Sequence, residues 1–324
     1  MLTFIIQPGP CAAAGQRTEY RIASEPAQTI DIRITDAQTG ELLGAKRVAD
    51  AEEATVDVAP VVRRNIEFDP QPGNVTGFLP SEDRTRTIRV TAATPEAPEN
   101  ETSAAECLFY PANETARPPA LLTSMPLQRL LAPGERDELT LLHEGTARAT
   151  VTATGPGGTT TRNYASGTGL LHLFRLCADD FPEAEEIRVD LGAAGTVVYS
   201  MTNVPHDACR LAWRSRAGSL EHYTFPTELS TTVEASKIRV CGPDGYSTAG
   251  LAASRLTRLR SACETRAAAE ALAEIVASPE VWRIVGDGYD PQDVVTDTVQ
   301  LQRQGALNVL EIEIRPRKTD GPCR

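Results

Sequence analysis

The chain has 324 residues, which is enough for two or three domains, and a hydrophobic content of 41% supports ordinary cores. Its net charge of −12 argues against nonspecific nucleic-acid binding, which requires a basic surface. No apolar run approaches the ~20 residues of a spanning helix, so we expect no membrane insertion. The N-terminus lacks the features of a signal peptide, so we expect a cytosolic chain unless a signal has been removed.

The first 117 residues predict an N-terminal β-sandwich domain. Residues 69–83 are rich in Pro and Gly and predict a long loop, and residues 94–105 predict an exposed excursion. Alternation of apolar and polar residues predicts strands at 18–22, 30–34, 42–48, 55–58, 61–62 and 87–90.

A middle β-domain is predicted over residues 118–204, after the boundary at Arg117-Pro118-Pro119. Gly155-Pro156-Gly157-Gly158 predicts a hairpin turn between Thr-rich strands. The predicted strands are 138–142, 147–153, 186–191 and 197–201.

A C-terminal β-rich domain is predicted over residues 205–324, and Cys209 to Pro226 is predicted to form a hairpin within it. Leu211 and Trp213 alternate with charged residues, which predicts one apolar and one charged face. Gly218 lies in the turn and is free to adopt a positive φ. A well-packed hairpin is the simpler interpretation, and a ligand-binding aromatic patch is the alternative.

One amphipathic helix is predicted near residues 262–277. Ser261 and Glu264 have the spacing of a capping box, with Ser261 as the N-cap, and Ser278-Pro279 ends the segment. Strands are expected at 293–298 and 309–314, the second with one buried face. That last strand could also complete a neighbour's sheet.

The sequence contains no convincing catalytic, cofactor or metal site. His206, Cys209, His222 and Cys241 could be imagined as zinc ligands, but their spacing matches no standard zinc module. Residues 155–160 lack the Lys of a phosphate-binding loop. Residues 287–293 do not fit a calcium loop, although a weakly bound ion remains an alternative.

Cysteines and carboxylates have plain interpretations. The seven cysteines are odd in number and include no Cys-x-x-Cys pair, which favours reduced, mostly buried thiols. Carboxylates at Asp179-Asp180 and at residues 183–186 predict solvated surface.

Three stretches together resemble tail-region structural proteins of Bacteroidetes phages and prophages, with a tail-tip, baseplate or distal-tail-like place. The first is Val56 to Arg63, the second is the hairpin from Cys209 to Phe225, and the third is the helix that ends at Ser278 to Trp282. Arg214-Ser215-Arg216 replaces the family's usual Asn, which puts any role of that Asn in doubt. The motif residues carried by the resemblance are Trp213, Gly218, Tyr223, Phe225, Pro279 and Trp282.

The resemblance implies a non-enzymatic virion protein of the tail, assembled in the host bacterial cytoplasm. It implies a homo-oligomer that docks to other phage tail proteins, with no cofactor. The alternative function is a cell-surface adhesin or carbohydrate-binding β-sandwich protein, with Trp213, Tyr223 and Phe225 as a sugar platform. That platform requires an exposed Trp213, so the burial of this residue discriminates between the two.

Overall fold

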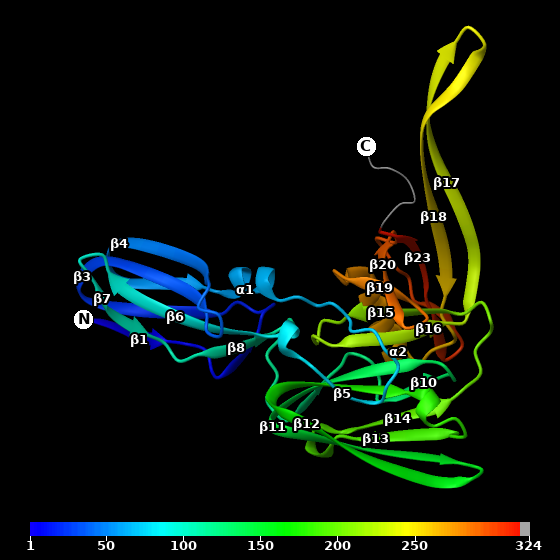
Figure 1. The fold of residues 1–324 in the computed structure, drawn as a ribbon, viewed down its shortest axis with the longest axis horizontal. Helices are drawn as coiled ribbons and strands as arrows, with labels where there is room; N and C mark the ends of the chain where they lie inside the picture. Colours follow the sequence, from blue (N-terminus) through cyan, green and yellow to red (C-terminus); the bar gives the residue numbers. More distant parts are fainter. Residues whose placement is uncertain (318–324) are drawn as a thin grey trace.

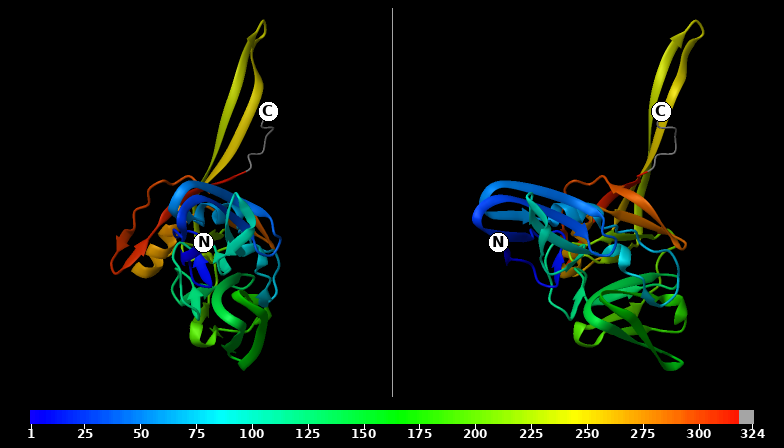
Figure 2. Two further views of the ribbon diagram at one scale, coloured as in Figure 1. Left: turned by 90° about the vertical axis from the view of Figure 1, so that its left-hand side faces the viewer. Right: turned by 60° about the vertical axis from the view of Figure 1, so that its left-hand side comes forward.

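The computed structural model describes residues 1–317 and is mainly β, with tandem β-sandwich-like domains, which confirms the predicted fold class (Figure 1). Three seven-stranded sheets follow one another along the chain, and a small two-stranded sheet accompanies the last one. The first sheet lies to one side, the second lies below, and the third carries a long hairpin that projects from the body (Figures 1 and 2). Within the described residues, neither α-helix is long and apolar enough to cross a bilayer.

The first sheet surrounds a core of aliphatic side chains with Tyr20 and Phe109. Its long strands β3 and β4 bend together through irregular register near residues 24–30. The predicted excursion at residues 94–105 is largely exposed, but it forms a strand that pairs with β6. The strands are β1 (Leu2–Ile6), β2 (Cys11–Ala13), β3 (Glu19–Asp36), β4 (Leu42–Asp57), β6 (Arg86–Thr94), β7 (Ala97–Ser103) and β8 (Cys107–Tyr110).

The predicted strand at Val61-Val62 is wrong, because these residues lie in helix α1 (Ala59–Asn65). Pro60 stands in the first turn, where its missing N–H costs no hydrogen bond. The Asp57 carboxylate accepts a hydrogen bond from the Ala59 N–H at 3.1 Å, and Val62 is buried against the first sheet. The short apolar run therefore covers a core as a helix rather than extending a sheet.

The second sheet is built around the antiparallel pair β11 and β12. Gly155 and Gly158 face each other across its turn, as predicted. The segment 69–83, predicted as a loop, contributes the short strand β5 to this sheet and a 3-10 turn at Glu82–Arg84. The strands are β5 (Gly77–Leu79), β9 (Ala120–Leu122), β10 (Gln128–Leu131), β11 (Arg136–Gly155), β12 (Gly158–Cys177), β13 (Glu186–Asp190) and β14 (Thr196–Met201).

The third sheet has the order β16-β15-β19-β20-β23-β18-β17. Its strands are β15 (Cys209–Arg214), β16 (Leu220–Phe225), β17 (Thr227–Gly242), β18 (Gly245–Arg260), β19 (Val281–Val285), β20 (Gly288–Val294) and β23 (Glu311–Pro316), and β21 (Gln302–Gln304) pairs with β22 (Leu307–Val309). The strand predicted at 293–298 instead ends at Val294.

The last strand does not offer a free edge. β23 pairs with β18 on one side and with β20 on the other. Its alternation is explained by Ile312 and Ile314, which are buried in the core of the third sheet. The expectation that it completes a neighbour's sheet is therefore wrong, because both of its hydrogen-bonding edges are occupied within the chain.

The late helix starts four residues later than the capping box implied. Helix α2 (Arg266–Ala273) has Thr265 as its N-cap, whose hydroxyl accepts a hydrogen bond from the Ala268 N–H at 3.2 Å. Ser261 instead receives the Leu310 N–H at 2.9 Å, which ties β18 to the last strand. A 3-10 turn over Glu274–Ala277 continues the helix up to Ser278.

The turn of the β15–β16 hairpin requires glycine. Gly218 has a φ of +87°, as the sequence predicted. A Cβ atom there would lie 2.9 Å from the backbone of Pro111 and of Ala112, which belong to the first domain. The Asn113 N–H also donates to the Arg216 carbonyl at 2.9 Å, so this turn joins the first and third domains.

We predict that Gly218→Ala lowers the free energy of unfolding by about 1–3 kcal/mol, because it adds backbone strain and a steric contact with another domain. Chemical denaturation measures the change. Gly40→Ala is the matched control, since Gly40 has a φ of +73° but open space around it. Equal losses in the two variants would contradict the role of the interdomain contact.

Candidate functional site

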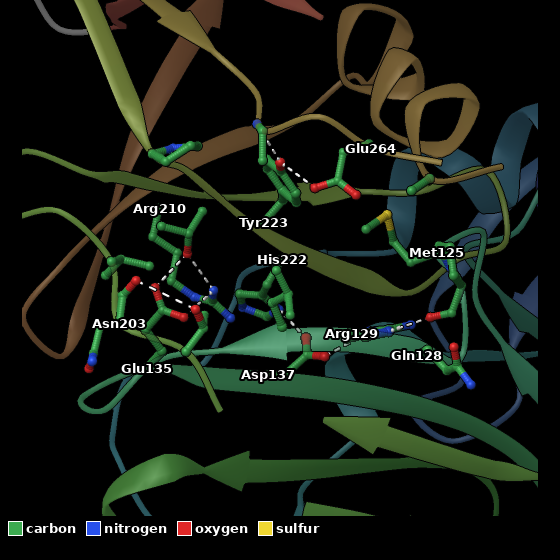
Figure 3. Close-up of a pocket in the computed structure, with 18 of the residues that line it drawn as sticks. Met125, Gln128, Arg129, Glu135, Asp137, Asn203, Arg210, His222, Tyr223 and Glu264 are labelled. Atoms are coloured by element: carbon green, nitrogen blue, oxygen red, sulfur yellow. Dashed lines mark hydrogen bonds and ion pairs between the residues drawn. The ribbon is translucent and has the colours of Figure 1, made fainter. Parts of the chain in front are cut away.

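Four consecutive charged residues stand where β11 begins, Glu135-Arg136-Asp137-Glu138, and the first three contact residues of the third sheet. Figure 3 shows Glu135 and Asp137. Asp137 and Glu138 are almost completely buried, and so is Arg136. Buried charges are costly unless each is paired and hydrogen-bonded. The arrangement of their partners therefore decides what this site does.

Asp137 is at the centre of the network. Its carboxylate accepts from the Arg129 guanidinium at 2.7 Å, from the Tyr199 hydroxyl at 2.8 Å and from His222 Nδ1 at 3.0 Å. His222 belongs to β16 in the third sheet, whereas Arg129 and Tyr199 belong to the second. One carboxylate therefore fixes the two sheets against each other.

The electrostatics of the network keep Asp137 charged and His222 neutral. Burial alone would raise the pKa of the Asp137 carboxyl, but Arg129 and His222 outweigh it and hold this pKa well below its usual range. Burial lowers the pKa of His222 and exceeds the opposite influence of Asp137. A neutral His222 donates through Nδ1 and accepts at Nε2 from the Tyr289 hydroxyl at 3.4 Å.

The network joins the second and third sheets, and the imidazole at its centre is fully enclosed. Both ring nitrogens of His222 are engaged with Asp137 and Tyr289, and its side chain has no exposed surface. A general base must reach a substrate proton, and this imidazole does not. The predicted place of His222 inside a strand is confirmed, since this residue lies in β16.

Arg136 crosses to the third sheet and holds the turn between β19 and β20. Its guanidinium donates to the carbonyls of Gly286 at 3.2 Å and of Asp287 at 3.0 Å, and it lies 4.7 Å from the ring centroid of Tyr289. A weakly bound ion is the alternative that the sequence leaves open for residues 287–293. The carbonyls of this turn are instead hydrogen-bonded to a guanidinium of the chain itself.

Glu138 extends the network towards the segment before β5. Its carboxylate pairs with Arg84 at 2.6 Å and with Arg175 at 3.8 Å. Arg175 also donates to the carbonyls of Pro72 at 3.2 Å and of Gly73 at 3.0 Å. The Pro/Gly-rich segment is thus held by charged hydrogen bonds, although a Pro/Gly-rich sequence by itself indicates only a loop.

A cavity of about 230 Å³ opens beside this network (Figure 3). The charged side chains in its walls are already paired within the chain. Arg210 pairs with Glu135 at 2.9 Å, and the Tyr223 hydroxyl donates to Glu264 at 2.7 Å. The charged groups therefore complete the interface between the sheets and leave little unpaired charge for a ligand.

The six motif residues are structural components of the third domain. Trp213 and Phe225 are fully buried in its core, and half-buried Tyr223 packs edge-to-face on Phe225 with centroids 5.0 Å apart. Trp282 stacks on Phe68 at 6.3 Å. Pro279 is exposed, whereas Gly218 is buried in the turn described above.

The imagined zinc ligands do not form a site in the described residues. His206 is fully exposed, Cys241 lies near the tip of the projecting hairpin, and Cys209 is buried in the core. Burial raises the pKa of the Cys209 thiol to about 11, which keeps it protonated at neutral pH. Residues 1–317 contain no group of three or more His, Cys, Asp or Glu that could hold a metal.

The other thiols fit the sequence interpretation only in part. The six cysteines of the described chain are free, and Cys107, Cys177 and Cys209 are buried. Cys241 and Cys263 are exposed, and Cys323 lies outside the described residues.

A second candidate site is the projecting hairpin of β17 and β18, which we call the arm and define as residues 229–256. Sequence analysis missed it. Nearly all of its side chains are exposed, among them Ile238 at 67% and Tyr246 at 79%. The signal that could have found it is the Pro243-Asp244 turn between two long runs of Thr, Ser, Ala and branched residues.

No known protein family and no curated protein matches the chain. Solved structures of immunoglobulin-domain proteins are found. The crystal structure of Dpr2 Ig1-Ig2 in complex with DIP-Theta Ig1-Ig3 shares 8% identity, covers 98% of this chain and 90% of that chain, and has a TM-score of 0.23. DIP-gamma IG1+IG2 shares 11% identity, with coverage of 62% and 96% and a TM-score of 0.21. Superpositions this loose show no common function.

We predict that stability falls as the pH drops from 7.5 to 5.5. A His with a depressed pKa stabilises the fold fully above its unfolded-state pKa of ~6.5, and this contribution is lost as the pH falls, by at most about 1.4 kcal/mol per pH unit. Asp137 acts in the same direction only near pH 4 and below. Urea denaturation across the pH range measures the loss.

The variant His222→Asn should reduce this pH dependence, whereas His206→Asn, at a fully exposed position, should leave it unchanged. A remaining slope is expected from His172, because burial also lowers its pKa. A slope for His222→Asn equal to that of the wild type would show that His222 takes up no proton on unfolding.

Proposed function

We propose that this chain is a non-enzymatic structural protein of a larger assembly, in the role of a phage or prophage tail component. The observation that carries the proposal is the arm. It leaves the body as an isolated two-stranded ribbon and meets no other part of the described chain along most of its length (Figures 1 and 2).

The arm is long enough to reach a neighbouring molecule. β18 pairs with β23 only over residues 257–260. The remaining residues 245–256 would span about 40 Å at ~3.3 Å per residue. A reach of this size is comparable with the diameter of a small domain.

The arm also exposes apolar side chains to solvent, which does not stabilise an isolated ribbon. Val233, Ile238, Val240, Tyr246 and Leu251 are each at least half exposed. Isolated two-stranded hairpins are marginally stable in water, and exposed apolar patches mark interaction sites. Burial against a partner would stabilise both the ribbon and the assembly.

The rest of the chain supports such a role. The charged interface around Asp137 joins the second and third domains, and the arm projects from the third. The −12 net charge favours solubility of free subunits before assembly.

A cell-surface adhesin is the second candidate function. Tandem β-sandwich domains are a common scaffold of cell-surface recognition proteins, and the arm could equally reach a surface partner. The sugar platform of Trp213, Tyr223 and Phe225 is wrong, because Trp213 and Phe225 have no exposed surface. An adhesin of this chain would need another binding surface.

Location separates the two functions. For a tail protein, we expect the chain in purified particles from induced cultures and its gene beside tail-tube or tape-measure genes. For an adhesin, protease added to intact cells should remove it. Quantitative mass spectrometry of both fractions measures this, and enrichment on the surface of particle-free cells would overturn the tail proposal.

We predict that an arm-truncated variant remains folded but loses self-association. Replacement of residues 233–255 by Asn-Gly joins Thr232 to Leu256, which face each other in the register, through a tight hairpin turn. Mass photometry and sedimentation velocity measure assembly, and circular dichroism checks the fold. Assembly by the truncated variant equal to that of the intact chain would refute a role for the arm.

A further inference from the structure

The register of the arm sorts its charges onto opposite faces. Residues that face each other in an antiparallel pair project to the same side, and neighbours along a strand alternate. The pairs Val233–Arg255, Lys237–Leu251 and Arg239–Thr248 therefore share one side. The other side carries Glu234, Ile238 and Val240.

We call the first side the cationic face. Lys237, Arg239 and Arg255 lie on it together with Val233, Leu251 and Tyr246. All three basic side chains are solvent-accessible, and none has an ion-pair partner within residues 1–317. On the same hairpin but nearer the body, Arg258 is paired with Glu311 at 2.7 Å, so the absence of partners is a property of the arm.

A complementary surface lies on the second sheet. Glu183, Glu185 and Glu186 are exposed just before and at the start of β13, and they have no ion-pair partner in the described part of the chain. We call these three residues the acidic lip. Its backbone is fixed, because the Glu185 N–H donates to the Thr154 carbonyl at 2.8 Å and the Glu185 carbonyl accepts from Met201 at 2.8 Å.

The arm does not meet the acidic lip of its own chain. In both figures the arm leaves the body on the side opposite the second sheet (Figures 1 and 2). Contact between the two charged surfaces therefore requires a second molecule.

We propose that the cationic face of the arm docks on the acidic lip of a second copy of this chain. This inference rests on the proposed assembly function and specifies its contact. Charge complementarity sets the register, and the apolar residues between the cations are covered on docking. Because two different patches meet, the contact can form a reciprocal two-fold pair, a closed ring or an open filament.

The charges on both surfaces are solvent-exposed, so the contact should weaken as salt rises. The triple variant K237Q/R239Q/R255Q should raise the dissociation constant for self-association about tenfold or more. The matched control T232E/S236E/S254E changes the net charge equally but acts on the opposite face, and it should associate as the wild type does.

A mixing experiment tests the partner surface. The variants K237E/R239E/R255E and E183K/E185K/E186K should each be monomeric alone, since like charges then meet. An equimolar mixture should restore association, because a reversed arm then meets a reversed lip. Sedimentation velocity of the full-length chains over a concentration and salt series measures association in each variant and in the mixture.

The outcomes distinguish this inference from the proposed function. Association that is lost on arm truncation but kept by K237Q/R239Q/R255Q overturns the cationic face and leaves the assembly function standing. Loss in that variant without restoration in the mixture overturns the acidic lip as the partner. A wild type that stays monomeric at every concentration overturns self-assembly and this inference together.

Discussion

The burial of three consecutive charged residues at the start of β11, Arg136, Asp137 and Glu138, is the constraint on which the rest of the structure depends. A carboxylate such as Asp137 cannot be left unpaired in the interior without a penalty of several kcal/mol. Its partners Arg129, Tyr199 and His222 supply this pairing from both sheets. Removal of Arg129 would leave this buried carboxylate without its cationic partner, which is strongly destabilising.

The same constraint organises the segment between α1 and β6, which leaves the first sheet, contributes β5 to the second sheet and then returns. Phe68 stacks on Trp282, Arg84 and Arg175 pair with Glu138, and β5 joins the second sheet. Residues 68–84, which contain little regular secondary structure, thus contact both the second and the third domain. This segment has a defined course because its carbonyls are the acceptors that buried guanidinium groups require.

The direction of the arm is set by the sheet from which it extends. A ribbon on a flexible base would point in many directions and would lose much of its binding energy to ordering. Here the arm continues strands that are also part of the third sheet, where β18 pairs with β23. Its direction is therefore set by the same packing that buries Trp213 and Leu259.

Local pattern in the sequence was enough for most strands, for the hairpin around Gly218 and for the mainly β class, because alternation and turn chemistry are short-range properties. It failed at Val61-Val62, which follow Pro60 in the first turn of a helix, and at Ser261, because Thr265 is the N-cap instead. It could not find the charged interface, because a run of charged residues such as Glu135 to Glu138 is typical of solvated surface. The partners Arg129 and His222, which make its burial possible, come from other strands. Tertiary structure alone decided that these charges are buried, that the last strand is enclosed and that residues 229–256 stand free, since each depends on which surfaces meet.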